Sequence, residues 1–187
     1  MPSSLVHSCR KAGVIFLATS GLLASSAAFA SELSPEFIKA HSTYATAWSA
    51  QDLSFTTAAF VTTPARSYGV YEPKATASFQ QGEPLIVYAE PVGYDFAQKD
   101  GEYLIDLSVG FELRNMTGQI LAAEESFAQI DHASRAMVRE FQTSLRLDLQ
   151  GIPEGDYLLK VSVKDNTGGD EGFFELPFNV LAPVATN

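Results

Sequence analysis

Residues 149–165 read LQGIPEGDYLLKVSVKD, and this stretch decides the fold class. Pro153 and Gly155 are turn residues, and the run that follows them alternates between apolar and polar side chains. The apolar positions are two residues apart, at Tyr157, Leu159, Val161 and Val163. A period of two is typical of an antiparallel strand with one face in a core and the other in water.

The same period recurs on both sides of this stretch. Residues 103–113, 141–149 and 174–180 also place apolar and polar side chains on opposite faces. Residues 85–89 are apolar on both faces, which predicts a more central strand. Turn residues separate the runs, at Gly82-Glu83-Pro84, Asp100-Gly101, Thr117-Gly118 and Gly168-Gly169. About eight strands at this spacing predict an all-β fold.

An antiparallel sandwich is favoured over an outer-membrane barrel. Pro177 lies inside the last run, and proline restricts a strand to an edge or a bulge. A lipid-facing barrel needs an apolar outer band on every strand. The outward positions here carry charged side chains instead, such as Arg146, Asp148 and Lys160.

The quoted stretch resembles the penultimate-strand region of immunoglobulin-like and fibronectin-III-like sandwiches. In those families a leucine, a Pro-Gly turn and a tyrosine introduce an alternating strand, as Leu149, Pro153, Gly155 and Tyr157 do here. The resemblance implies an Ig-like sandwich in which the tyrosine hydroxyl braces the corner through a hydrogen bond to the backbone. The cysteine pair of antibody domains and a core tryptophan within the strands have no counterpart in this sequence.

The N-terminus has the three parts of a secretory signal peptide. Arg10 and Lys11 precede a short apolar run, and the small residues after it end in Ala28-Phe29-Ala30, an A-x-A cleavage site. An uncleaved anchor is the alternative, but the run is shorter than the roughly 20 residues of a membrane span. We therefore predict a signal peptide over residues 1–30, cleavage near Ser31 and a periplasmic or secreted mature protein.

A helix is predicted over residues 34–50. Ser34 suits the N-cap and Pro35 the first helical position. Phe37, His41, Tyr44 and Trp48 share one face, which we expect to pack on the domain with Trp48 as its anchor. The predicted organisation is thus a helical segment over residues 31–52, a β-sandwich over 53–181 and a flexible tail over 182–187.

Removal of the signal peptide changes the composition in two ways. The only cysteine, Cys9, leaves with it, so the mature chain has no disulfide and no thiol nucleophile. Two basic residues also leave, so that ten basic residues face 22 acidic ones, for a net charge of about −12. Such a surface repels phosphate backbones and anionic lipid, which argues against nucleic-acid and peripheral membrane binding.

The residues suited to catalysis are few. The mature chain has two histidines, His41 and His132, and contains no G-x-S-x-G, H-E-x-x-H or phosphate-binding glycine motif. Asp131, His132 and Ser134 lie too close in sequence for a typical triad, which is recognised by its three-dimensional geometry. A carboxylate-based hydrolase stays as an alternative, although nothing singles out one pair of acids.

The loop from Asp165 to Glu171 is the best metal candidate. Its carboxylates Asp165, Asp170 and Glu171, with the Asn166 amide, are oxygen ligands of the kind that Ca²⁺ prefers. The alternative, which we favour, is a glycine-rich hairpin turn with solvated acids, and no cofactor is expected.

Two aromatic loops on either side of the predicted central strand form the best binding candidate. The first carries Arg66, Tyr68 and Tyr71, and the second carries Glu90 and Tyr94. Tyrosine rings beside a charged group can grip a peptide or stack on a sugar ring. The alternative is that these tyrosines belong to the core or rim of the sandwich.

Taken together, these features predict a non-catalytic exported β-sandwich. We expect a binding or accessory module for a protein or cell-envelope partner, with carbohydrate binding as the alternative. Fold resemblance carries no function by itself, so this prediction depends on the Arg66–Tyr94 segment.

Overall fold

The computed structural model describes residues 31–182. The predicted signal peptide, and all of the predicted tail except Ala182, lie outside these residues. The chain divides into two units, 1–34 and 35–187, and the described residues 31–34 of the first unit form neither helix nor strand. Within residues 31–182 no helix is both long enough and apolar enough to cross a membrane.

The second unit begins with one helix, α1 (Pro35–Ser49), close to the predicted bounds. Trp48 is its anchor, as expected, because the indole is 6% exposed and its Nε1 donates to the Tyr94 carbonyl over 2.9 Å. The rest of the predicted face is largely exposed, with Phe37 and Tyr44 at 56% and 50%. The Tyr44 ring lies 5.8 Å from the Arg139 guanidinium, so the prediction that the whole face is covered by the domain is wrong for Phe37 and His41 and holds in part for Tyr44.

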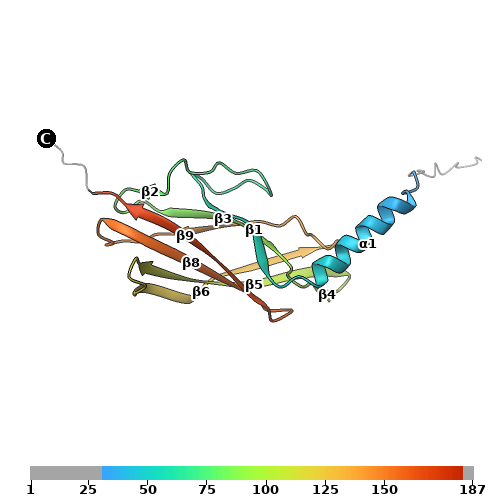
Figure 1. The fold of residues 1–187 in the computed structure, drawn as a ribbon. Coiled ribbons are helices and arrows are strands. Elements are labelled where there is room, and N and C mark those ends of the chain that lie inside the picture. Colours follow the sequence, from blue (N-terminus) through green and yellow to red (C-terminus); the bar gives the residue numbers. More distant parts are fainter. Residues whose placement is uncertain (1–30, 183–187) are drawn as a thin grey trace, which may run out of the picture. The chain divides into compact units, whose positions relative to one another are not determined.

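The remainder is a mostly β domain with two sheets (Figure 1). The described residues contain nine strands, where about eight are expected from the sequence. The strands are β1 (Ser54–Phe60), β2 (Ser78–Phe79), β3 (Leu85–Val92), β4 (Ala97–Lys99), β5 (Glu102–Asn115), β6 (Ile120–Ser134), β7 (Thr143–Leu147), β8 (Gly155–Asp165) and β9 (Glu171–Val180). Two of the nine, β2 and β4, are only two and three residues long. The first sheet has the order β1-β3-β7, and the second has the order β2-β9-β8-β5-β4, with β6 also paired to β5.

One core lies between the two sheets. Val87 and Leu147 of the first sheet and Leu107 and Val161 of the second belong to a single cluster, each with at most 1% of its surface exposed. The alternating runs of the sequence therefore point into this core. β3 is the middle strand of its sheet and its first seven residues are buried, which confirms the prediction of a central strand.

Pro177 lies where β9 has a partner on one side. It is paired with Leu158 of β8, whereas β2 reaches only Asn179 and Val180 on the other side. Within the described residues this part of β9 is thus a sheet edge, the position expected of a strand proline.

The start of β8 forms the expected corner. The Tyr157 hydroxyl donates to the Pro153 carbonyl over 2.8 Å, and the ring is 5% exposed. This hydrogen bond spans the Pro153–Gly155 turn and fixes how β8 enters the sheet.

Candidate functional site

Residues 62–73, named the flap here, fold over the outer face of the three-stranded sheet. The base of the flap is a β-bridge between Val61 and Pro73, and Thr62 N–H donates to the Glu72 carbonyl over 3.0 Å. Nearer the tip, Arg66 N–H donates to the Val70 carbonyl over 3.2 Å. These contacts make the flap a hairpin rather than an irregular loop.

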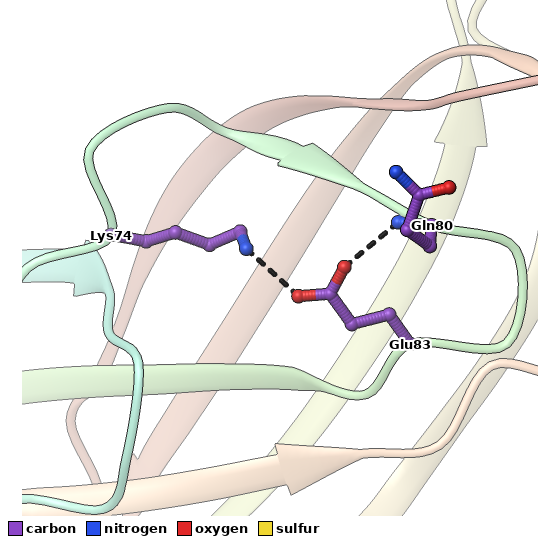
Figure 2. A network of polar contacts seen from close by, with 3 residues as sticks. All are labelled: Lys74, Gln80 and Glu83. Carbon is purple, nitrogen blue, oxygen red and sulfur yellow. Dashed lines mark hydrogen bonds and ion pairs between the residues drawn. The ribbon is translucent and has the colours of Figure 1, made fainter.

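The flap is attached to the sheet at its middle, and Lys74, the residue that follows it, is paired with the turn between β2 and β3. Ala65 N–H donates to Ser144 Oγ of β7 over 3.0 Å. At the base, the Lys74 ammonium lies 2.8 Å from Glu83 Oε1, and Glu83 Oε2 accepts the Gln80 N–H, as Figure 2 shows. Burial alone would raise the pKa of Glu83, but Lys74 and the Gln80 N–H together hold that pKa below its ordinary value.

Beneath the flap lies a second, smaller apolar cluster. Ile86 and Tyr88 of β3 point outward and are covered by Val61, Ala65 and Tyr71. The Tyr71 and Tyr88 rings stack with their centroids 4.1 Å apart, and Tyr88 has no exposed surface. The flap therefore buries the outer face of β3, which is why this strand is apolar on both sides.

A buried carboxylate, Glu90, is the centre of the polar contacts at this site. Its side chain is on the same face as Tyr88 and the residue is 7% exposed. Glu90 Oε1 accepts from the Tyr88 hydroxyl over 2.5 Å, and Oε2 accepts from the Thr56 and Thr57 hydroxyls over 3.0 Å each. The Tyr88 hydroxyl in turn accepts the Gly69 N–H of the flap over 2.8 Å. This chain of hydrogen bonds connects β1, β3 and the flap tip.

The same contacts shift the pKa values of the groups involved. Burial and the hydrogen bond to Glu90 raise the pKa of Tyr88 to about 12. Burial alone would raise the pKa of Glu90, but the hydroxyl donors outweigh it and lower that pKa. Burial and the nearby Glu90 charge also raise the pKa of Tyr68. At neutral pH the site therefore holds a buried anion stabilised by hydroxyl groups.

The structure brings four of the five predicted binding residues together. Arg66 and Tyr68 lie at the flap tip, Tyr71 lies under it and Glu90 lies on the strand below. Arg66 is exposed, Tyr68 is 37% exposed, and the neighbouring Val70 is 52% exposed. Of these four, only Arg66 and Tyr68 are well exposed to a partner, because the Tyr71 ring is stacked on Tyr88 and Glu90 is buried.

Tyr94, the fifth residue, lies in the core instead. It has no exposed surface, its ring meets Trp48 edge to face at 5.0 Å, and its hydroxyl donates to the Val138 carbonyl over 2.7 Å. Gly93 makes this close packing possible, since a Cβ there would lie 2.5 Å from the Gln51 carbonyl oxygen. Tyr94 thus holds α1 to the domain.

The Asp165–Glu171 loop uses its first carboxylate to support the backbone. Asp165 is 1% exposed and accepts the Asp95 N–H over 2.7 Å and the Thr167 N–H over 2.8 Å. Asp170 and Glu171 are exposed. Among residues 31–182 no group of three or more acidic, histidine or cysteine side chains is placed to hold a metal ion. The loop therefore does not gather Asp165, Asp170 and Glu171 into the calcium site considered from sequence.

Sequence reasoning missed Thr56 and Thr57, whose hydroxyls donate to Glu90, and Gly69, whose N–H donates to the Tyr88 hydroxyl. Thr57 is the register partner of Glu90 across β1 and β3, and this pairing follows from the sheet rather than from any local motif. Comparison of the chain with models of protein families finds no match, and comparison with curated proteins finds none either.

Proposed function

We propose that this protein is a non-catalytic, periplasmic binding or accessory module that captures a protein or other cell-envelope component with the tip of the flap. The observation that carries the proposal is the exposed group Arg66, Tyr68 and Val70 on a hairpin that is bonded to the sheet beneath it. Tyrosine and arginine are frequent at the energetic centres of interfaces. A rigid support lowers the entropy lost on binding.

The proposed scaffold is an immunoglobulin-like sandwich. In that fold strands A, B and E share one sheet, and G, F, C and C′ share the other. The sheet orders β1-β3-β7 and β9-β8-β5-β6 correspond to this arrangement, and the Tyr157–Pro153 hydrogen bond corresponds to its tyrosine corner. Export to the periplasm is proposed from the N-terminal sequence alone.

The chemistry of the tip suits a partner with an acidic or polar surface beside an apolar contact. The Arg66 guanidinium makes no ion pair within residues 31–182, although the chain as a whole carries a net charge of −10. A free cation at the tip of an acidic protein is a point where an anionic group of a partner can approach.

The test is affinity capture from a periplasmic and envelope extract with the cleaved protein as bait. A double variant, Arg66→Glu with Tyr68→Ala, should lose the captured partner while its melting temperature stays the same, because both side chains lie outside the core. The matched control is Phe173→Ala, which removes a 60% exposed aromatic ring from the other sheet and should keep the partner.

Equal capture by the double variant and the wild type would place the binding surface elsewhere. A glycan array run with the same proteins separates the two partner classes. A glycan retained by the wild type and lost by the double variant would replace the protein partner with a carbohydrate.

A further inference from the structure

The long strand β6 has one open edge. It runs for 15 residues and pairs with β5, and within residues 31–182 no strand pairs with its other edge (Figure 1). Residues 120–126 are exposed on both faces of the strand. The outward N–H and C=O groups of this half are therefore open to another strand.

Exposed apolar side chains accompany this open backbone. Ile120 and Leu121 are 51% and 45% exposed, and Met116 in the preceding turn is 69% exposed. Edge strands in soluble proteins are commonly protected by charged side chains, lysine above all, by proline, by bulges or by being very short. β6 contains neither lysine nor proline, and its length exceeds the usual 3–10 residues of a strand.

A groove of about 760 Å³ lies on the outer face of the sheet, lined by residues of β5, β8 and the first half of β6. Its charged lining residues are Glu112, Glu124, Glu125, Glu171 and Lys164. Glu112 is paired with Arg114, and Glu171 lies 3.9 Å from Lys164. Glu124 and Glu125 make no ion pair within the described residues, so the groove has a surplus of negative charge where it borders β6.

The fold fixes the place of these two glutamates. Three β6 residues, 125–127, lie opposite the single residue Gly110 in a bulge. A Cβ at Gly110 would lie 2.9 Å from the Glu125 carbonyl oxygen and 3.0 Å from that of Glu124, so the bulge rests directly on the glycine. Bulges of this kind are structural features that re-aim side chains. The bulge thus places both acids in the lining of the groove.

We propose that residues 120–124 of β6 bind an extended segment of a partner protein, rich in lysine or arginine alternating with apolar residues, as an added antiparallel or parallel strand. Backbone hydrogen bonds supply affinity in strand addition, and side-chain contacts supply selectivity. The exposed Ile120 and Leu121 side chains offer apolar contacts to the segment. Glu124 and Glu125 attract its cations.

A second copy of this chain fits the edge less well. β6 carries Glu124, Glu125 and Asp131 and no lysine or arginine, so self-pairing brings acids toward acids. The net charge of −10 adds to this repulsion. This surface is separate from the flap, and the proposal does not depend on the function proposed for the flap.

The test uses synthetic nine-residue peptides with blocked ends. A peptide alternating lysine and valine should bind the cleaved protein with an affinity that falls as salt rises, and should slow hydrogen exchange at the amides of residues 120–124. A glutamate-valine peptide should not bind. Two versions of the lysine peptide carry N-methyl groups on alternate residues, one on the odd and one on the even positions. Only one version should lose binding, because only one set of N–H groups points toward the β6 edge.

Protein variants distinguish binding at the β6 edge from non-specific attraction of the peptide to an acidic protein. Leu121→Lys should lower the affinity for the lysine-valine peptide more than tenfold. Met137→Lys, which also introduces a lysine but at a 42% exposed residue elsewhere, should leave this affinity unchanged. Replacing Glu124 and Glu125 by glutamine should weaken binding about threefold to tenfold, as expected for exposed ion pairs. The flap variant Tyr68→Ala should bind the peptide normally.

Three results would overturn the proposal. The first is unchanged exchange at residues 120–124 when the peptide is bound. The second is equal binding by both N-methylated peptides. The third is a concentration-dependent dimer in sedimentation that Leu121→Lys abolishes, which would assign the edge to a second copy.

Discussion

The strands β3 and β6 differ most in how far the rest of the domain covers them. β3 is the middle strand of its sheet, the core lies on one side of it and the flap on the other, and its first seven residues are buried. β6 is nearly twice as long, lies at the margin of the other sheet and is exposed on both faces over its first seven residues. The polar groups of β3 are satisfied within the domain, and those along one edge of β6 face solvent.

This difference indicates that β3 contributes mainly to the stability of the fold, whereas β6 is the strand open to a partner. A strand whose side chains all have internal partners contributes to the free energy of unfolding and offers nothing to a ligand. A strand with open backbone groups contributes less and can accept a partner. The following substitutions test whether the division holds.

The largest expected effect on the free energy of unfolding comes from removing the Tyr88 ring. Tyr88→Ala removes a fully buried ring and its stack with Tyr71, and takes away one of the three hydroxyl donors to the Glu90 carboxylate. We expect a loss of about 3–5 kcal/mol in the free energy of unfolding, measured by urea denaturation. The comparison variant Leu121→Ala in β6 should change it by less than about 0.5 kcal/mol. Similar losses in both variants would mean that β6 carries as much of the fold as β3.

The next largest effect on the free energy of unfolding is expected from the buried carboxylate of Glu90 on β3. Glu90→Gln keeps the shape of the side chain but weakens the acceptor for three hydroxyl groups, so we expect a loss of about 1–3 kcal/mol at neutral pH. Glu124→Gln on β6 is the matched control and should have almost no effect, since Glu124 is exposed.

The pH dependence of the Glu90 variant has a definite sign. The folded-state pKa of Glu90 lies below the ordinary value of 4.5, so its stabilising contribution is complete above that pH. The contribution is lost as the pH falls through the lowered pKa. Wild type and Glu90→Gln should therefore converge in stability on acidification below 4.5, in thermal melts at stepped pH. A constant difference between them at all pH values would rule out this role for the charge.

The predictable strands are those that meet the core on one face. β5, β8 and β9 have a clear period of two because water wets one side of each and the core covers the other. β6 was not predicted, although it is the longest strand. The first half of β6 does not contact the core, so its sequence does not need to alternate between apolar and polar residues. In the second half, the bulge at residues 125–127 interrupts the alternation.

The candidate site could be predicted only in part, for a similar reason. The positions of Arg66, Tyr68 and Tyr71 near Glu90 follow from loops on either side of a central strand. Whether a tyrosine is buried depends on tertiary packing, and Tyr94 has the same local sequence character as the others while filling the core. The hydroxyl partners of Glu90 depend on the register between β1 and β3.

The smallest expected contrast is between two glycines that each lie against a neighbouring backbone, one in the core at Leu53 and one at the bulge of β6. Gly172→Ala would place a Cβ 2.3 Å from the carbonyl oxygen of Leu53, a residue that is 3% exposed and cannot shift without disturbing the core. Gly110→Ala meets the β6 bulge at 2.9 Å, and an edge strand can move away. We therefore expect about 1 kcal/mol for Gly110→Ala and clearly more for Gly172→Ala in urea denaturation. Hydrogen exchange at residues 120–126 should rise in Gly110→Ala alone. A larger loss at Gly110 would mean that the bulge is held as rigidly as the core, and β6 would then be a fixed docking edge rather than a yielding one.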